Sequence, residues 1–269
     1  MISSRVPGAA RPIVEEYQRC LEQYAPQLVA GIYLAGSIAL GVYQAGQSDI
    51  DFITVLSREA QEQDIRALGR AHESVEKFYP RSALEGSYLQ WRDLGRPKES
   101  IAPYPCYFSR RTHPAARHDI NPVTWWILRY HGIAVAGPQP SALGYEVPWE
   151  SVHAYTLANL HTYWAAWTTS PVRLARLLTD DGIQWAVLGI ARLLYALQER
   201  TMTGKLQAGE YALKWAPARW RKLVQEAVDL RSGRGTRYYR SRLIRAADAV
   251  AFLRYVIAFC TGGADGRSL

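Results

Sequence analysis

The chain has 269 residues, of which 48% are hydrophobic and 21% charged, and its formal net charge is +8 at pH 7. This composition is typical of a globular protein that buries a sizeable core, and it excludes a disordered or fibrous chain. The basic balance fits a polyanionic partner, either a nucleoside triphosphate or a nucleic acid, without choosing between them.

The cysteines and the apolar stretches indicate the compartment. Cys20, Cys106 and Cys260 lie far apart and form no C-x-x-C motif, which argues for a reducing compartment and against a disulfide framework or a zinc site. The amino terminus lacks the apolar core of a signal peptide. The most apolar late stretch, residues 249–260, is too short to span a bilayer. We therefore expect a cytoplasmic protein without a membrane segment.

Hydrophobic periodicity predicts a first half that mixes helices and strands. Residues 97–105 are broken by prolines and are expected to form a loop. In chain order the expected elements are a helix over 13–24, strands over 28–34 and 50–56, a helix over 60–78, strands over 83–91 and 106–109, a helix over 121–131 and a strand over 133–136. Such an order is typical of a small mixed sheet with flanking helices.

The pattern becomes helical beyond Gly137-Pro-Gln-Pro140, where strand signals nearly vanish. Pro148 and Pro217 stand where prolines of a first helical turn belong. Helices are expected over about 149–168, 181–200, 207–215, 217–231 and 236–260. The prediction is an α+β protein with two domains, residues 1–145 and an all-α helical bundle over residues 146–269.

Two short motifs early in the chain carry the chemistry. An apolar run ends at Gly36-Ser37, and the next one opens with Asp49-Ile-Asp51. On a strand, residues i and i+2 share a face, so the two carboxylates should lie side by side and repel unless a cation lies between them. Mg²⁺ prefers oxygen ligands completed by substrate phosphates, and the N–H groups of a Gly-Ser turn can approach a phosphate closely. These parts predict metal-assisted chemistry on a nucleoside triphosphate; the alternative is an ordinary turn before a solvated Asp pair.

A third acidic candidate lies on the next predicted strand. Glu85 stands in an alternating apolar run and shares a face with Ser87, opposite Leu84 and Tyr88. A carboxylate amid strand residues is costly unless it is paired or metal-bound. Glu85 is therefore expected to join the aspartate pair; the alternative is a solvent-facing glutamate on an edge strand.

The order of these motifs resembles the nucleotidyltransferase superfamily. Together with the helical second half it resembles, more closely, the aminoglycoside O-adenylyltransferases that modify spectinomycin and streptomycin, the (3'')(9) type. Three segments of the second half are similar to that family's Ser-Arg-x-x-Tyr helix, Thr-Gly-Lys turn and Trp-containing helix: Leu188-Gly-Ile-Ala-Arg192-Leu-Leu-Tyr195, Thr203-Gly-Lys205 and Ala212-Leu-Lys-Trp215. The resemblance implies that residues 1–145 form a nucleotidyltransferase catalytic domain and that residues 146–269 complete the nucleotide and acceptor sites.

The resemblance also implies a role for each matching residue. Asp49 and Asp51 would bind magnesium, two ions in all, and Glu85 would be the catalytic base and a further metal ligand. ATP would be the co-substrate, held by Gly36 and Ser37 and contacted by two basic residues of the helical half, Arg192 and Lys205. The acid with which the family binds its cationic drug matches Gly182 here, so that the neighbouring side chains expected at the acceptor are Asp180, Asp181 and Trp185.

The expected activity is therefore Mg-dependent transfer of AMP from ATP to a hydroxyl of a small polyhydroxylated, cationic acceptor such as an aminoglycoside. Such an enzyme confers antibiotic resistance, and we expect a cytoplasmic monomer that binds no nucleic acid. The alternatives are a nucleotidyltransferase acting on RNA or protein, of the tRNA-modifying or toxin–antitoxin type, and a non-catalytic nucleotide-binding protein. The arginine-rich stretch 231–245 is the best support for nucleic acid, although a solvated helix face is expected there.

Two pairs in the middle of the chain have no role in this scheme, Arg110-Arg111 and His118-Asp119. A catalytic His–Asp pair is one interpretation. Pro114 and Pro122 favour a plain surface loop instead.

Overall fold

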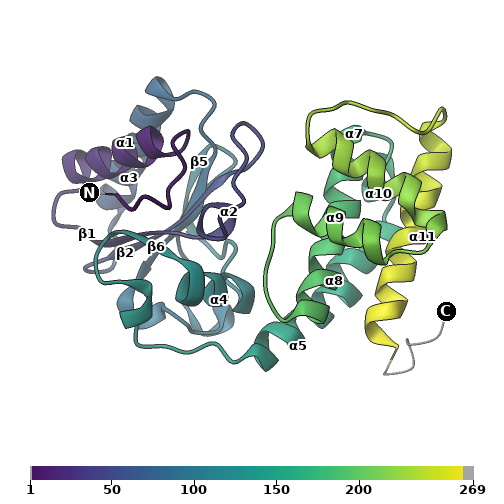
Figure 1. Ribbon diagram of the computed structural model, residues 1–269. Helices are drawn as coiled ribbons and strands as arrows, with labels where there is room; N and C mark the ends of the chain where they lie inside the picture. Colours follow the sequence, from purple (N-terminus) through teal and green to yellow (C-terminus); the bar gives the residue numbers. More distant parts are fainter. Residues whose placement is uncertain (1, 263–269) are drawn as a thin grey trace. The chain divides into compact units, whose positions relative to one another are not determined.

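The computed structural model describes residues 2–262, which divide into two compact units between Pro148 and Trp149 (Figure 1). The first unit contains a six-stranded sheet with helices, and the described part of the second unit is helical. The predicted α+β class is therefore confirmed. Met1 and residues 263–269, which the predicted domains include, lie outside the described residues.

The sheet has the strand order β5-β4-β3-β2-β1-β6. Its strands are β1 (Val29–Leu34), β2 (Ile50–Leu56), β3 (Leu84–Gln90), β4 (Tyr104–Phe108), β5 (Arg111–Ala116) and β6 (Ile133–Ala136). Only the β2–β3 pair is parallel among the described strands, and α3 (Glu62–Phe78) provides the crossover that such a pair requires. The register of this pair sets Asp51 directly beside Glu85.

β5 was expected to be loop, and the structure corrects this prediction. Proline has no backbone N–H and cannot donate a hydrogen bond to a neighbouring strand, so the presence of Pro114 predicted a loop over residues 111–116. β5 is an edge strand, paired only with β4 in the sheet order, and an edge position tolerates proline. β2 and β6 have the predicted bounds, and the other predicted strands of this unit differ from the observed ones by a few residues.

Two amphipathic helices cover one face of the sheet, α1 (Arg11–Tyr24) and α3, which lie side by side in Figure 1. They bury residues such as Val14 and Leu68 against Phe52 and its neighbours on the sheet. Because side chains alternate along a strand, the carboxylates of Asp51 and Glu85 belong to the opposite face. The remaining helices of this unit are α2 (Gly36–Ala39), α4 (Pro122–His131), η1 (Trp91–Asp93), η2 (Lys98–Ser100) and η3 (Pro140–Ala142).

A buried polar cluster lies between α3 and the sheet. His72 Nε2 is 2.7 Å from the hydroxyl of Tyr88, which also accepts a hydrogen bond from Tyr17. The His72 ring stacks on Tyr107, with ring centroids 3.5 Å apart. Burial lowers the pKa of His72 to about 3, so this imidazole is neutral in the folded protein at neutral pH.

His72 is expected to make the protein acid-sensitive. Its pKa is lower in the folded than in the unfolded chain, so its contribution to stability is complete above about pH 6.5 and decreases as the pH falls toward 3. The expected loss is about 1.4 kcal/mol for each pH unit below that value. Urea denaturation of wild type and His72→Phe at pH 7 and pH 5 measures it: the variant should lose less stability on acidification. Equal losses in the two proteins would refute this role.

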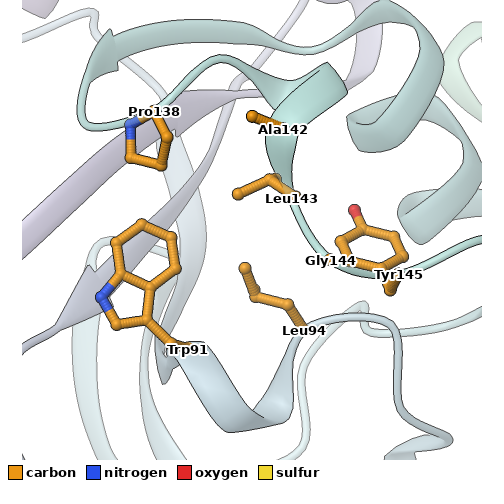
Figure 2. Close-up of a pocket in the computed structure, with 7 residues that line it drawn as sticks. All are labelled: Trp91, Leu94, Pro138, Ala142, Leu143, Gly144 and Tyr145. Atoms are coloured by element: carbon orange, nitrogen blue, oxygen red, sulfur yellow. The ribbon is translucent and has the colours of Figure 1, made fainter.

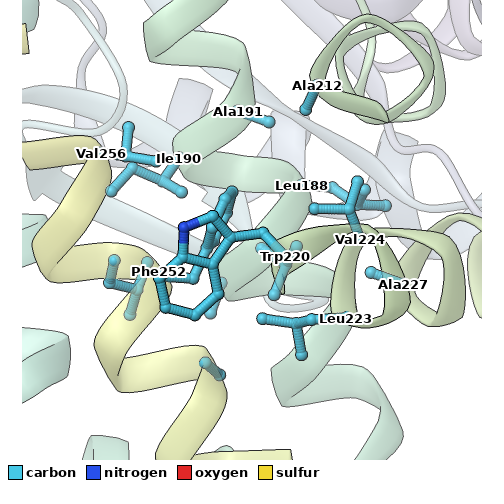
Figure 3. Close-up of a cluster of buried hydrophobic side chains, with 14 of the residues drawn as sticks. Leu188, Ile190, Ala191, Ala212, Trp220, Leu223, Val224, Ala227, Phe252 and Val256 are labelled. Carbon is cyan, nitrogen blue, oxygen red and sulfur yellow. The ribbon is translucent and has the colours of Figure 1, made fainter. Parts of the chain in front are cut away.

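The second unit is a helical bundle around a single apolar core. Trp220 lies in this core with its near neighbour Leu223 and with Leu188 and Phe252, which come from distant parts of the chain (Figure 3). Its helices are α5 (Trp149–Asn159), η4 (Leu160–Trp164), η5 (Ala165–Thr168), α6 (Pro171–Arg176), α7 (Asp180–Ile183), η6 (Gln184–Leu188), α8 (Gly189–Glu199), α9 (Lys205–Trp215), α10 (Ala218–Arg231) and α11 (Arg242–Thr261). η4 and η6 are π-helical turns within longer helical runs.

The last helix begins later than predicted, at Arg242 rather than near residue 236. Gly233 and Gly235, just before, have φ angles of 77° and 65°, which a right-handed helix does not contain. Within residues 2–262 no helix combines the length and the apolar character that crossing a bilayer requires.

Candidate active site

The candidate site is a row of carboxylates at the start of the two parallel strands. Asp51 is the second residue of β2 and Glu85 the second residue of β3, and the register places them side by side on one face. Asp49 immediately precedes β2 and is exposed. The structure therefore brings the three acids predicted from the sequence to the same edge of the sheet.

The turn after β1 is built around Asp51. The Ala35 N–H donates to the backbone carbonyl of Asp51 over 2.9 Å, and the Ser37 N–H donates to the Asp51 carboxylate. Gly36 has a φ angle of 51°, and a Cβ atom added to it would lie 1.8 Å from Asp51 Oδ2. Glycine at position 36 thus leaves the space that the carboxylate fills, which gives a local reason for the Gly-Ser motif.

Burial, with the charges of Asp119, Asp49 and Glu85 acting in the same direction, raises the pKa of Asp51 to about 7. The carboxyl group therefore carries a proton for much of the time at neutral pH unless a cation lies beside it. This donor set fits Mg²⁺, which binds carboxylate oxygens and is commonly held by one or two of them together with substrate phosphates. Within residues 2–262 no three acidic, histidine or cysteine side chains are arranged to hold a metal ion by themselves.

Glu85 is held from the side away from Asp51. Its Oε1 atom accepts a hydrogen bond from the backbone N–H of Ser109, 3.2 Å away. Ser109 and Arg110 form the two-residue turn between β4 and β5, and both have positive φ angles, 51° and 57°. The glutamate therefore lies between the aspartate of β2 and the tip of the β4–β5 hairpin.

Asp119 also belongs to this site, although the sequence alone gave it no role. The Ser87 hydroxyl, on the same face of β3 as Glu85, donates to the His118 carbonyl over 3.0 Å, and the Tyr104 hydroxyl donates to it over 3.3 Å. Asp119, with a φ angle of 46°, follows directly, and among the neighbouring carboxylates it raises the pKa of Asp51 most. In the sequence, Asp119 was visible only as part of the unassigned His118-Asp119 pair. Its position beside Asp51 could not be predicted because it depends on β5, which was not predicted.

In the second unit the structure brings together two of the predicted residues. Lys205 opens α9, and its Nζ lies 4.2 Å from the ring centroid of Trp185 in η6. The Trp185 indole N–H in turn donates to the hydroxyl of Tyr163 over 2.9 Å. Lys205, Trp185 and Tyr163 therefore form a basic and aromatic cluster. Arg192 lies on α8 and is exposed.

The predicted acceptor ligand Asp180 has a different role in the structure. Its Oδ1 accepts from Arg245 and its Oδ2 from Arg237, both over 2.7 Å, and these partners lower its pKa. Arg245 is 2% exposed and also bonds Glu226, which is fully buried. The geometry therefore favours a structural role for Asp180, whereas Asp181 is exposed and forms a 3.1 Å ion pair with Arg176.

The same contacts correct the expectation for the arginine-rich stretch 231–245. It was expected to be a solvated basic face, yet Arg237 and Arg245 pair with Asp180, and Arg234 pairs with Asp229 over 3.3 Å. Several arginines of this stretch therefore form ion pairs within the helical unit. Because these charges already have acidic partners, the interpretation of the stretch as a nucleic-acid binding surface is weaker.

A separate cavity of about 240 Å³ lies in the first unit (Figure 2). Trp91, which lines it, follows the last residue of β3, whereas Glu85 stands near the first. A strand rises about 3.3 Å per residue, so the cavity and the carboxylate row lie roughly 20 Å apart along β3. The walls of the cavity are Trp91, Leu94, Pro138, Ala142, Leu143, Gly144 and Tyr145.

Two protein families match separate parts of the chain. The sequence model of the nucleotidyltransferase domain matches residues 14–93, which contain the Gly-Ser turn and the three acids. The model of the aminoglycoside adenylyltransferase C-terminal domain matches residues 161–258. No curated protein matches the chain in sequence.

The fold is also similar to a solved structure, that of spectinomycin adenyltransferase AAD(9) from Enterococcus faecialis with ATP and spectinomycin. The TM-score is 0.66 and the sequence identity 14%, and the similarity covers 92% of this chain and 98% of that chain. The two family models together match more than half of the chain. The chain therefore belongs to the aminoglycoside adenylyltransferases of the nucleotidyltransferase superfamily, and it is an enzyme of nucleotidyl transfer.

Proposed function

We propose that this enzyme transfers AMP from ATP, with Mg²⁺, to a hydroxyl of an aminoglycoside-like molecule and thereby inactivates an antibiotic. The observation that carries the proposal is the pairing of Asp51 with Glu85 beside the Gly36–Ser37 turn. The similar adenyltransferase was solved with ATP and spectinomycin, which supports both the nucleotide and the class of acceptor. A cytoplasmic monomer, in a compartment that keeps the three free cysteines reduced, completes the proposal.

The carboxylate row would perform two tasks. Asp49 and Asp51 would hold the divalent ions, which when bound polarise the phosphoryl oxygens and offset the developing charge. Glu85 would accept the proton of the attacking hydroxyl, a contribution that is typically worth about 10²–10⁴-fold in rate. Gly36 and Ser37 would lie against the triphosphate, whose charge fits backbone N–H donors.

The helical unit would supply positive charge and a flat wall. Arg192 and Lys205 would contact the phosphates, since both are basic and belong to the matched C-terminal domain. Trp185, already under the Lys205 ammonium, would contact the acceptor through its ring. Asp181 remains an acidic side chain exposed enough to meet an ammonium group, whereas Asp180 is occupied by two arginines.

Pyrophosphate release tests this function. Purified protein is incubated with Mg-ATP and a panel of aminoglycosides that includes spectinomycin and streptomycin. Release that depends on one acceptor, and that is lost in Asp49→Ala and in Glu85→Gln, supports the proposal. Unchanged release in either variant removes the corresponding residue from its role, and no release with any acceptor rejects the proposed substrate class.

Gly36→Ala is expected to abolish turnover because its methyl group would occupy the place of Asp51 Oδ2. We expect a loss of at least about 10²-fold, since a displaced metal ligand misplaces the reacting groups. Gly41→Ala is the matched control: Gly41 has a φ angle of 71°, but no atom lies within 4 Å of its added Cβ. Pyrophosphate release and melting temperature are measured for both, and equal activities in the two variants would contradict the contact.

A further inference from the structure

The turn between β4 and β5 holds one oxygen of Glu85. The Ser109 N–H reaches Glu85 Oε1 over 3.2 Å because the β3–β4 register, which pairs Gly86 with Tyr107, brings the end of β4 alongside the start of β3. A backbone donor on one oxygen fixes the orientation of a carboxylate and leaves the other oxygen available to accept a proton. The position of this turn therefore determines the orientation of the Glu85 carboxylate.

Arg110 anchors the same turn to a part of the unit outside the hairpin. Its Nη2 donates to Glu76 Oε2 and its Nη1 to the carbonyl of Pro80, both over 2.8 Å. Glu76 also accepts a hydrogen bond from the Tyr107 hydroxyl over 2.6 Å. The guanidinium thus joins the end of α3, the segment before β3 and the hairpin through two directed bonds, which a planar fork of donors can make at once.

The turn needs such an anchor because of its backbone. Ser109 and Arg110 both occupy the left-handed region, which favours glycine and asparagine, and neither residue has that preference. Strain of this kind persists where surrounding contacts determine the conformation. The Arg110 side chain is about half exposed, at 53%, so its ion pair with Glu76 contributes little to global stability. Its main effect is on the local geometry of the β4–β5 turn.

We propose that Arg110 is a positioning residue for Glu85: it holds the β4–β5 turn so that the Ser109 N–H orients the Glu85 carboxylate toward the acceptor hydroxyl. The inference rests on the proposed role of Glu85 as the base. It gives a role to Arg110, which the sequence left unassigned.

Arg110→Ala tests the proposal through a separation of kinetic constants. We expect kcat to fall about tenfold, as is typical when the partner of a site residue is removed, with the KM for ATP changed less than about twofold and the melting temperature nearly unchanged. Arg110→Lys should restore part of kcat. Arg111→Ala is the matched control, because Arg111 has the same charge, is exposed and stands next in sequence, and it should keep the wild-type kcat.

Glu76→Gln is a second route to the same result, should Arg110→Ala fold poorly. It weakens the other end of the anchor and should lower kcat in the same way. A wild-type kcat in both Arg110→Ala and Glu76→Gln would overturn the proposal, and so would an equal fall in Arg111→Ala.

A double-mutant cycle separates this inference from the function on which it rests. In the Glu85→Gln background, single-turnover rates should show no further loss on adding Arg110→Ala, because the group that Arg110 positions is already disabled. A full additional loss there would mean that Arg110 acts by another route. If Glu85→Gln alone kept its full rate, the proposed role of Glu85 as the base would be wrong. If Glu85→Gln were inactive while Arg110→Ala kept its full kcat, only the positioning role of Arg110 would be wrong.

Discussion

Asp51→Asn is expected to abolish pyrophosphate release and, at the same time, to stabilise the protein in the absence of divalent ions. Asparagine keeps the shape that fills the space beside Gly36 and can still accept the hydrogen bond from the Ser37 N–H. It cannot supply a charged ligand, so we expect activity to fall by about 10³-fold or more. The two effects have opposite signs because the ionised carboxylate is costly until a cation neutralises it.

The stability change has a defined pH dependence. The pKa of Asp51 rises from 3.8 to about 7 on folding, so wild type loses stability as the pH rises through that window, whereas Asp51→Asn does not. Each unit of pKa difference corresponds to about 1.4 kcal/mol, which makes the expected gain at pH 8 on the order of 4 kcal/mol.

Urea denaturation in EDTA at pH 5 and pH 8 measures this gain. Asp49→Asn is the control, since Asp49 is exposed and its loss should remove activity with little change in stability. A lower stability of Asp51→Asn at pH 8 would mean that the carboxylate is not strained by its surroundings.

The second large effect concerns the helical unit, where Arg245→Ala is expected to cost about 3–5 kcal/mol of unfolding free energy. Arg245 is 2% exposed and bridges Asp180 and Glu226, and the latter is fully buried. Without the arginine, Glu226 would keep the backbone N–H groups of Tyr238 and Tyr239 as partners, but its buried charge would lose the cation that neutralises it.

Arg242→Ala is the matched control for that substitution, because Arg242 lies three residues earlier on the same helix and is exposed. Asp180→Asn should likewise lower the melting temperature without raising the KM for a cationic acceptor. A raised KM at an unchanged melting temperature would restore Asp180 as an acceptor ligand and reject the structural role.

Much of the first unit could be predicted because its signals are local. The apolar run 50–56 forms β2 with the predicted bounds, and the alternation around Glu85 placed its carboxylate on the correct face. The pairing of Asp51 with Glu85 follows from a parallel β2–β3 register. That register depends on the crossover through α3, which the hydrophobic pattern of residues 60–78 also indicated.

What was missed depends on contacts between distant parts of the chain. Pro114 opposes a strand in isolation, and only its edge position makes β5 possible. Asp119 reaches the site because Ser87 and Tyr104 hold the neighbouring carbonyl, which no spacing in the sequence reveals. Asp180 looked available for a ligand because its arginine partners lie 57 and 65 residues later.

The most direct measurement is the transfer of label from ATP, marked at the α-phosphorus, to spectinomycin or another acceptor. We expect wild type to label the acceptor only when Mg²⁺ is present. Asp51→Asn and Glu85→Gln, both verified as folded by their cooperative unfolding, should leave the acceptor unlabelled. Transfer that continues in EDTA, or that proceeds at the wild-type rate in either variant, would contradict the carboxylate row as the catalytic centre.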